Sequence, residues 1–166
     1  MSEPRALRCY EYVNRPYEGV RELIHRDPLK LLQRATTSAA ARARSLVANL
    51  RVQVVGIEIG VDVRVLVRRT RDEERGPGSV PLTRVELTWE ATRLPALFPS
   101  MLAEVSAQPL SATETQLEVA GSYWPPLGSI GNAIDATVGH RVAEAAVHRL
   151  LVDLAEQIRD DVPMRS

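Results

Sequence analysis

The feature that most constrains this chain is one long helical pattern near its C-terminal end. No proline interrupts residues 127–158 after Pro126, and apolar side chains recur there at four-residue spacing. This spacing predicts a continuous helix. The repeating positions are Ile130, Ile134, Val138, Val142, Ala146, Leu150, Leu154 and Ile158.

The apolar stripe of this helix cannot stay on one side. At about 100° per residue, a strict four-residue repeat drifts by roughly 40° at each step. The early apolar residues are Leu127, Ile134, Val138, Val142 and Ala145, and the late ones, on nearly the opposite side, are Val147, Leu150, Leu151, Leu154 and Ile158. Either the helix bends near Gly139, or its first half faces a concave sheet while its second half packs on other helices or a partner chain. The pattern does not choose between them.

Most of the remaining chain has the two-residue period of β-strands. Short helices are expected to open at Pro16 and after Asp27, and the state of residues 36–44 stays open. Alternation from residue 46 onward changes parity at Val55-Gly56, which indicates a tight turn or a β-bulge. Other strands are expected at residues 7–14, 82–92, 101–109 and 115–123, with loops at 71–81 and 94–99.

Composition limits the class of protein. The chain has 166 residues, 45% of them hydrophobic, and 21 basic residues balance 21 acidic ones. We expect one domain over residues 1–166 with its core at about 7–158, and no binding of nucleic acid. A single cysteine, no apolar leader and no transmembrane-length apolar span favour a cytoplasmic protein without an integral membrane segment.

Two segments and the order of elements resemble a known superfamily over nearly the whole chain. The segments are GSYWPPLGSIGNAID at residues 121–135 and YVNRPYEGVRELI at residues 12–24. They resemble the START-like (SRPBCC, helix-grip) superfamily, which includes polyketide cyclases and lipid-transfer domains. The resemblance implies an α+β fold, in which a curved antiparallel sheet wraps around a long C-terminal helix and two short helices follow the first strand. It implies an apolar cavity but little chemistry, because the superfamily carries many functions.

If the apolar parity of each strand faces the helix, the charged residues lie on the solvent face. These are Glu58, Asp62, Arg64, Arg68, Arg84, Glu86, Glu90, Glu104 and Glu118. We expect them to form cross-strand pairs. Inside, only Trp89, Tyr123 and either Tyr10 or Tyr12 would offer polar tips, so an apolar ligand fits better than a charged one. The alternative is a packed core without space for a ligand.

The candidate ligand-binding residues lie on the inner side of the strands and on the first half of the long helix. They are Ile59, Val61, Val63, Leu87, Trp89, Met101, Ala103, Val105, Val119, Tyr123, Ile130, Ile134 and Val138. Glycines and alanines between Gly128 and Gly139 thin out this half of the helix. They leave space for a ligand or allow a turn and close backbone packing.

No residue pattern assigns catalysis, a metal or a cofactor. His140, Glu144 and His148 share one strip of the helix but are interpreted as solvated, because the histidines are eight residues apart. His25 is interpreted as a surface residue near a helix end rather than a general base, and Cys9 as a buried strand residue.

Three functional hypotheses follow. The first, which we favour, is a non-enzymatic carrier or binding protein for a hydrophobic small molecule, such as a lipid or a polyketide-like compound. The second is a cyclase or hydratase in which a tyrosine or His25 shuttles protons. The third is an interaction module with a filled core, in which Leu150, Leu151 and Leu154 bind a partner or form a homodimer.

Overall fold

A computed structural model describes residues 3–37, 63–74, 76–91, 100–124 and 140–164 of the chain. A second short helix covers residues 28–37 directly after α1. The named elements are β1 (Arg5–Val13), α1 (Tyr17–Arg26), β2 (Val63–Glu73), β3 (Leu82–Ala91), β4 (Ser100–Pro109), β5 (Thr115–Trp124) and α4 (His140–Asp161).

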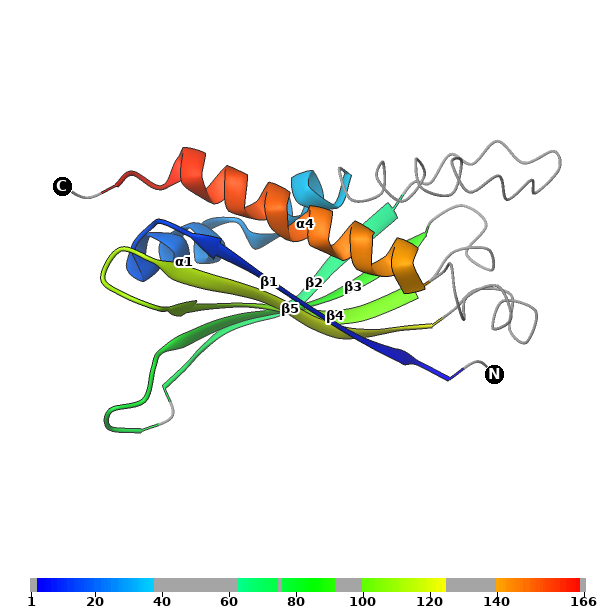
Figure 1. Cartoon of the computed structure of the whole chain (residues 1–166), viewed down its shortest axis with the longest axis horizontal. Helices are drawn as coiled ribbons and strands as arrows, with labels where there is room; N and C mark the ends of the chain where they lie inside the picture. The colour runs from blue at the N-terminus through cyan, green and yellow to red at the C-terminus, as the bar shows by residue number, and fades with distance from the viewer. Residues whose placement is uncertain (1–2, 38–62, 75, 92–99, 125–139, 165–166) are drawn as a thin grey trace, which may run out of the picture.

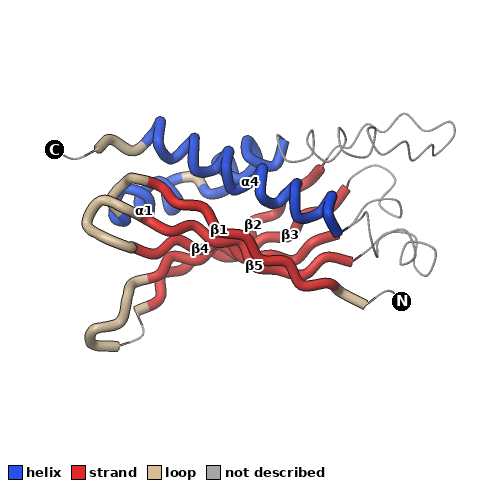
Figure 2. Tube along the Cα trace, viewed as in Figure 1, coloured by secondary structure: helices blue, strands red, loops and turns tan. Residues whose placement is uncertain are grey.

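The strands form one antiparallel sheet in the order β1-β5-β4-β3-β2. The first strand therefore lies beside the last one, and β2, β3, β4 and β5 are neighbours in the order of the sequence. Figures 1 and 2 show α4 running along the sheet, with α1 near the C-terminal end of α4. This arrangement is the α+β helix-grip fold that the sequence predicted.

One face of the sheet is apolar and is covered by the helices. Side chains alternate between the two faces along each strand, and most of those on the inner face are almost completely buried. The buried inner residues are Leu7, Val13, Val65, Thr83, Val85, Leu87, Met101, Ala103, Val105, Ala107, Thr115, Leu117, Val119 and Tyr123. The alternation expected for residues 82–92, 101–109 and 115–123 is confirmed by β3, β4 and β5.

The late apolar side of the long helix belongs to the core. Leu150, Leu151 and Leu154 are each at most 2% exposed. The hypothesis that these leucines form a free partner-binding face is therefore wrong, because the chain itself covers them. The first half of the predicted helix, including the bend considered at Gly139, lies outside the described residues.

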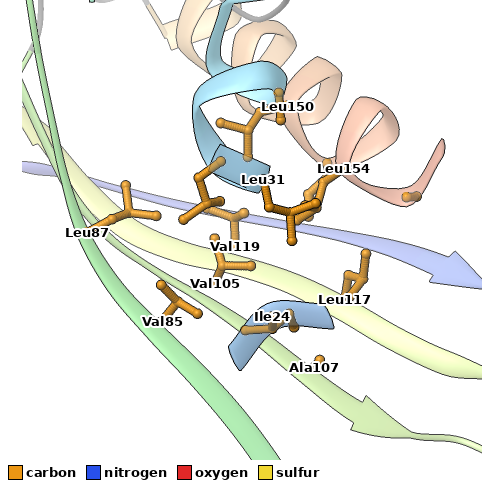
Figure 3. Close-up of a cluster of buried hydrophobic side chains, with 14 of the residues drawn as sticks. Ile24, Leu31, Val85, Leu87, Val105, Ala107, Leu117, Val119, Leu150 and Leu154 are labelled. Atoms are coloured by element: carbon orange, nitrogen blue, oxygen red, sulfur yellow. The ribbon is translucent and has the colours of Figure 1, made fainter. Parts of the chain in front are cut away.

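The second short helix inserts an apolar side chain between α4 and the sheet. Figure 3 shows Leu31 between Leu150 and Leu154 on one side and Val105 and Val119 on the other. All five side chains are at most 7% exposed. The core is therefore filled where Leu31 lies between α4 and the strands β4 and β5.

A β-bulge in β2 changes which of its side chains face inward. Val65 is opposite Trp89, but the register shifts between Val67 and Arg69, so that Asp72 pairs with the buried Thr83. The extra residue reverses the parity of the strand beyond it. The loop expected to start at residue 71 therefore begins only after Glu73, where β2 ends.

Gly121 marks a close approach of β5 to β4. A Cβ atom there would lie 2.5 Å from the Leu102 carbonyl oxygen and 2.8 Å from the Ala103 Cα. Both atoms belong to the backbone of the paired strand and cannot rotate away. Only glycine fits at this position of the sheet.

Candidate functional site

The candidate site begins with a row of large side chains across the inner face. Trp89 is paired with Met101, and Met101 with Tyr123, so three neighbouring strands present these residues side by side. Tyr123 and Met101 are 2% and 7% exposed, whereas Trp89 is only partly buried. The row therefore combines two aromatic rings and a flexible thioether, which adapts to irregular apolar shapes.

The next row along the sheet is built from smaller residues at its centre. Leu87 is paired with Ala103, and Ala103 with Gly121, which faces Leu7 of β1. Two adjacent positions thus carry a methyl group or no side chain, between leucines at the two sides. The centre of this row therefore carries little side-chain volume, and at Gly121 the backbone of β4 fills the place of the missing Cβ atom.

The row beyond contains Val105 and Val119, which the sequence also assigned to the ligand. These valines are paired with each other and are at most 2% exposed. They pack beneath Leu31 in the cluster of Figure 3. In this structure they form the floor of the packed core, while Leu87, Trp89, Met101, Ala103 and Tyr123 lie nearer the end of the sheet where β3 stops.

The other predicted lining residues are not tested by the described part of the structure. Val63 belongs to β2 and its backbone pairs with Ala91, whereas its side chain is outside the described part of the structure. The remaining candidates, Ile59, Val61, Ile130, Ile134 and Val138, are outside the described residues.

Charged side chains predicted for the outer face, among them Arg84, Glu86, Glu104 and Glu118, lie there. Two others, Glu58 and Asp62, are outside the described residues. Arg84 binds Glu104 and also Glu73, with 3.0 Å between Nε and the Glu73 carboxylate. Arg71 lies 2.6 Å from Glu86. These contacts connect β2, β3 and β4, and each such pair contributes at most about 1 kcal/mol when it is solvent-exposed.

The two tyrosines of β1 do not face the interior. Tyr10 and Tyr12 are 44% and 57% exposed. They share the outer parity of Arg8, whose guanidinium carbon lies 5.9 Å from the centre of the Tyr10 ring. The idea that Tyr10 or Tyr12 supplies an inner polar tip is therefore wrong.

The candidate reactive residues have ordinary structural environments. Cys9 is partly buried on the inner side of β1, and burial, together with the negative charge of Glu144, raises the pKa of its thiol. A thiol with a raised pKa is a poor nucleophile at neutral pH. Glu144 and His148 are exposed on α4. Among the described residues, no three potential metal ligands gather.

Sequence reasoning missed a polar cluster at the other end of the inner face. The Tyr17 hydroxyl lies 2.8 Å from the Thr83 Oγ1, and Thr83 donates to Asp72 across 2.8 Å. His25 and Arg21 bind the same carboxylate. The four-residue spacing of Tyr17, Arg21 and His25 is visible in the sequence, but their common partner is not, because the sequence pattern predicts a loop at Asp72.

Fold and site together define a helix-grip protein whose outer face is charged and whose inner face is mostly apolar, with Arg5, Glu11 and Asp72 on the two edge strands. Within the part of the chain that is described, no helix is long and apolar enough to cross a membrane. No family model matches the sequence, and no curated protein matches it.

Solved structures with similar folds are distant in sequence. The protein TTHA0849 from Thermus thermophilus is 13% identical, with a TM-score of 0.47 over 93% of this chain and 97% of the other. The Zhui aromatase/cyclase of Streptomyces sp. R1128 is also 13% identical, with a TM-score of 0.41 over 95% and 97%. Norcoclaurine synthase from Thalictrum flavum, in complex with dopamine and hydroxybenzaldehyde, is 9% identical, with a TM-score of 0.46 over 96% and 88%.

Proposed function

We propose that this protein binds a hydrophobic small molecule, such as a lipid or a polyketide-like compound, against the inner face of its sheet. One observation carries the proposal: the Trp89, Met101 and Tyr123 row lies directly beside the small residues Ala103 and Gly121. A ligand at this place would meet aromatic and thioether groups on one side. It would also lie over the methyl group of Ala103, which projects less from the sheet than the large side chains beside it.

The distribution of charge supports an apolar ligand. Arg71, Arg84 and their carboxylate partners all lie on the outer face. The side chains of the row itself, Trp89, Met101 and Tyr123, carry no charge, so a charged group placed over them would lose its hydration without a counter-ion. Arg5, which is paired with Tyr123 on the edge strand β1, would meet only a ligand group that reaches this edge. Each buried CH₂ group of an apolar ligand contributes about 0.8 kcal/mol, so a chain or ring system of modest size suffices for stable binding.

The proposal is tested first by native mass spectrometry of the purified protein, followed by organic extraction and identification of any adduct. Two variants localise the binding. Ala103→Leu adds volume to the inner face, whereas Leu102→Ala changes the neighbouring residue of β4, which is 45% exposed on the outer face. We expect Ala103→Leu to lose the adduct and Leu102→Ala to retain it.

A filled core gives a different result. In that case no apolar compound from a panel of fatty acids, sterols and aromatic polyketides binds, and Ala103→Leu lowers stability by about 1–3 kcal/mol through overpacking. Equal binding by both variants would place the ligand elsewhere.

The enzymatic alternative receives no support from His25. That residue is hydrogen bonded to Asp72, and its side chain is 37% exposed. Two of the structural neighbours are named as a cyclase and a synthase, and turnover of an extracted ligand would assign a comparable role to this chain.

We further infer a cytoplasmic location for this carrier. A homodimer would have to use a surface other than the buried leucines of α4. Sedimentation velocity measures the oligomeric state directly, and a monomer at high protein concentration would rule out the homodimer.

A further inference from the structure

Three polar residues of α1 form one stripe that points at a single carboxylate. Tyr17, Arg21 and His25 are spaced four residues apart, so they lie on adjacent turns of the same side of the helix. Arg21 Nε donates to Asp72 Oδ2 across 2.8 Å. His25 Nε2 lies 2.9 Å from Asp72 Oδ1. The third residue of the stripe, Tyr17, reaches the same carboxylate through Thr83.

The bulge in β2 is what brings Asp72 to this position. Without the extra residue between Val67 and Arg69, the alternation from Val65 would turn residue 72 to the outer face. With it, Asp72 lies opposite Thr83, at the end of the inner face that α1 covers. The bulge thus places a carboxylate beneath a helix that carries matching donors.

The hydrogen bonds of this cluster all depend on an ionised Asp72. Thr83 donates its hydroxyl proton to Oδ1, so it accepts from the Tyr17 hydroxyl. Tyr17 and Thr83 are 6% and 0% exposed, which leaves their hydroxyl groups out of reach of bulk water. A proton added to Oδ2 of Asp72 would point at the Arg21 guanidinium, which can only donate, and protonation of the carboxyl removes the negative charge that attracts this cation.

The cluster is reachable by protons from solvent because the Asp72 side chain is 31% exposed. The groups that face it are Tyr17, Arg21 and His25 from α1, Thr83 from β3, and Glu18, which lies 3.4 Å from Arg21. Of these, Glu18 alone would compete for Arg21, and its side chain is 67% exposed.

We propose that Asp72 is the centre of a proton-sensitive latch that fastens α1 across the end of the sheet. Protonation of Asp72 releases the polar stripe of α1 while β3, β4 and β5 stay folded. The latch is independent of the proposed ligand binding, since it uses other residues.

The pH range in which α1 is released follows from the direction in which the pKa of Asp72 is shifted. Burial alone would raise the pKa of Asp72, but hydrogen bonds from His25, Thr83 and Arg21 outweigh it and lower the pKa below its usual value. Because the pKa is lowered, the stability that ionised Asp72 gives to the docking of α1 is complete above the ordinary aspartate pKa of about 3.9. This stability disappears as the pH falls through the lower pKa of the folded state. The latch is therefore closed at neutral pH and opens in acid.

Amide hydrogen exchange followed by NMR tests the latch in the full chain. Near pH 7 we expect Asp72→Asn to lower the protection of α1 amides by about tenfold to a hundredfold, with the amides of β3, β4 and β5 little changed. After correction for intrinsic exchange, acid should lower the protection of α1 in the wild type to the level of Asp72→Asn, and should have little further effect on that variant. The matched control is Glu22→Gln, an exposed carboxylate of the same helix, which should behave like the wild type.

A second variant keeps the test decisive if Asp72→Asn does not fold. Arg21→Gln removes one cation but leaves the Thr83 and His25 contacts, so α1 should open at a higher pH than in the wild type. Equal protection of α1 in wild type and Asp72→Asn, or an unshifted opening in Arg21→Gln, would overturn the latch. A loss of protection in the sheet that equals the loss in α1 at the same pH would also overturn it.

Discussion

At the scale of single residues, Gly19 decides how closely α1 can approach the end of α4. A Cβ atom at Gly19 would lie 2.5 Å from Cγ1 of Val162. Val162 is itself only 5% exposed and follows the last residue of α4. A side chain at residue 19 therefore requires Val162 to move.

This contact predicts a mutation whose effect changes sign. Gly19→Ala should destabilise the wild type by about 1–3 kcal/mol, because overpacking outweighs the gain in helix propensity. In a Val162→Ala background the same substitution should be neutral or stabilise by up to about 1 kcal/mol. Urea unfolding of the four proteins in a double-mutant cycle measures this, and additive effects would contradict the packing explanation.

Residue-scale reasoning from sequence had clear limits. The inner positions of Leu87, Met101 and Tyr123 were predictable because alternation directly reports which face a side chain occupies. The inward position of Asp72 was not, since one extra residue at a bulge leaves no mark in composition.

At the scale of elements, the end of α4 is held by a cation from the β1–α1 connection. Arg15 donates from Nε to the Val162 carbonyl across 2.5 Å and from Nη2 to the Arg159 carbonyl across 2.6 Å. The last carbonyl groups of a helix lack partners within the helix and carry partial negative charge. Thr115 also fixes this connection by donating to the Arg15 carbonyl across 2.8 Å.

Arg15→Ala should therefore destabilise the protein by about 2–3 kcal/mol, because two partly buried carbonyls lose a charged donor. Arg15→Lys should recover only part of this, since an ammonium group lacks the forked geometry that reaches both carbonyls. Arg26→Ala, at an exposed position near the end of α1, is the control and should cost little. Thermal unfolding provides the comparison, and equal melting temperatures for all three variants would be incompatible with this capping role.

The elements themselves were largely predictable, and their packing was not. The expected strand at residues 82–92 is β3 (Leu82–Ala91), and the helix expected to open at Pro16 is α1 (Tyr17–Arg26). Strand and helix periods are local properties that the sequence carries directly. The insertion of Leu31 between α4 and the sheet depends on residues far apart in the chain, so no local pattern indicated it.

At the scale of the whole molecule, two neighbouring carboxylates with lowered pKa values, Asp72 on the inner face and Glu73 on the outer face, set the response to acid. Burial would raise the pKa of Glu73, but the charges and hydrogen bonds of Arg84 and Arg71 outweigh it and lower the pKa. Asp72 is shifted in the same direction. For both groups the unfolded chain binds protons more readily than the folded one, so stability falls as the pH drops through their range.

We expect the free energy of unfolding to decrease below about pH 4.5, the region in which unfolded carboxylates begin to bind protons. The double variant Asp72→Asn, Glu73→Gln should be less stable at neutral pH and should show a shallower decrease in acid. Urea titrations at several pH values provide the test. Parallel pH profiles for the wild type and the double variant would show that these two carboxylates do not set the acid response.

The most direct test of ligand binding on the inner face uses the chain's two tryptophans as separate reporters. Trp89 lies in the proposed site, whereas Trp124 is 38% exposed at the end of β5. In Trp124→Phe, titration with the extracted ligand, or with fatty acids, sterols and aromatic polyketides, should change the Trp89 emission to saturation. In Trp89→Phe, the Trp124 emission should stay constant. A saturating change at Trp124 with none at Trp89 would contradict a binding site on the inner face.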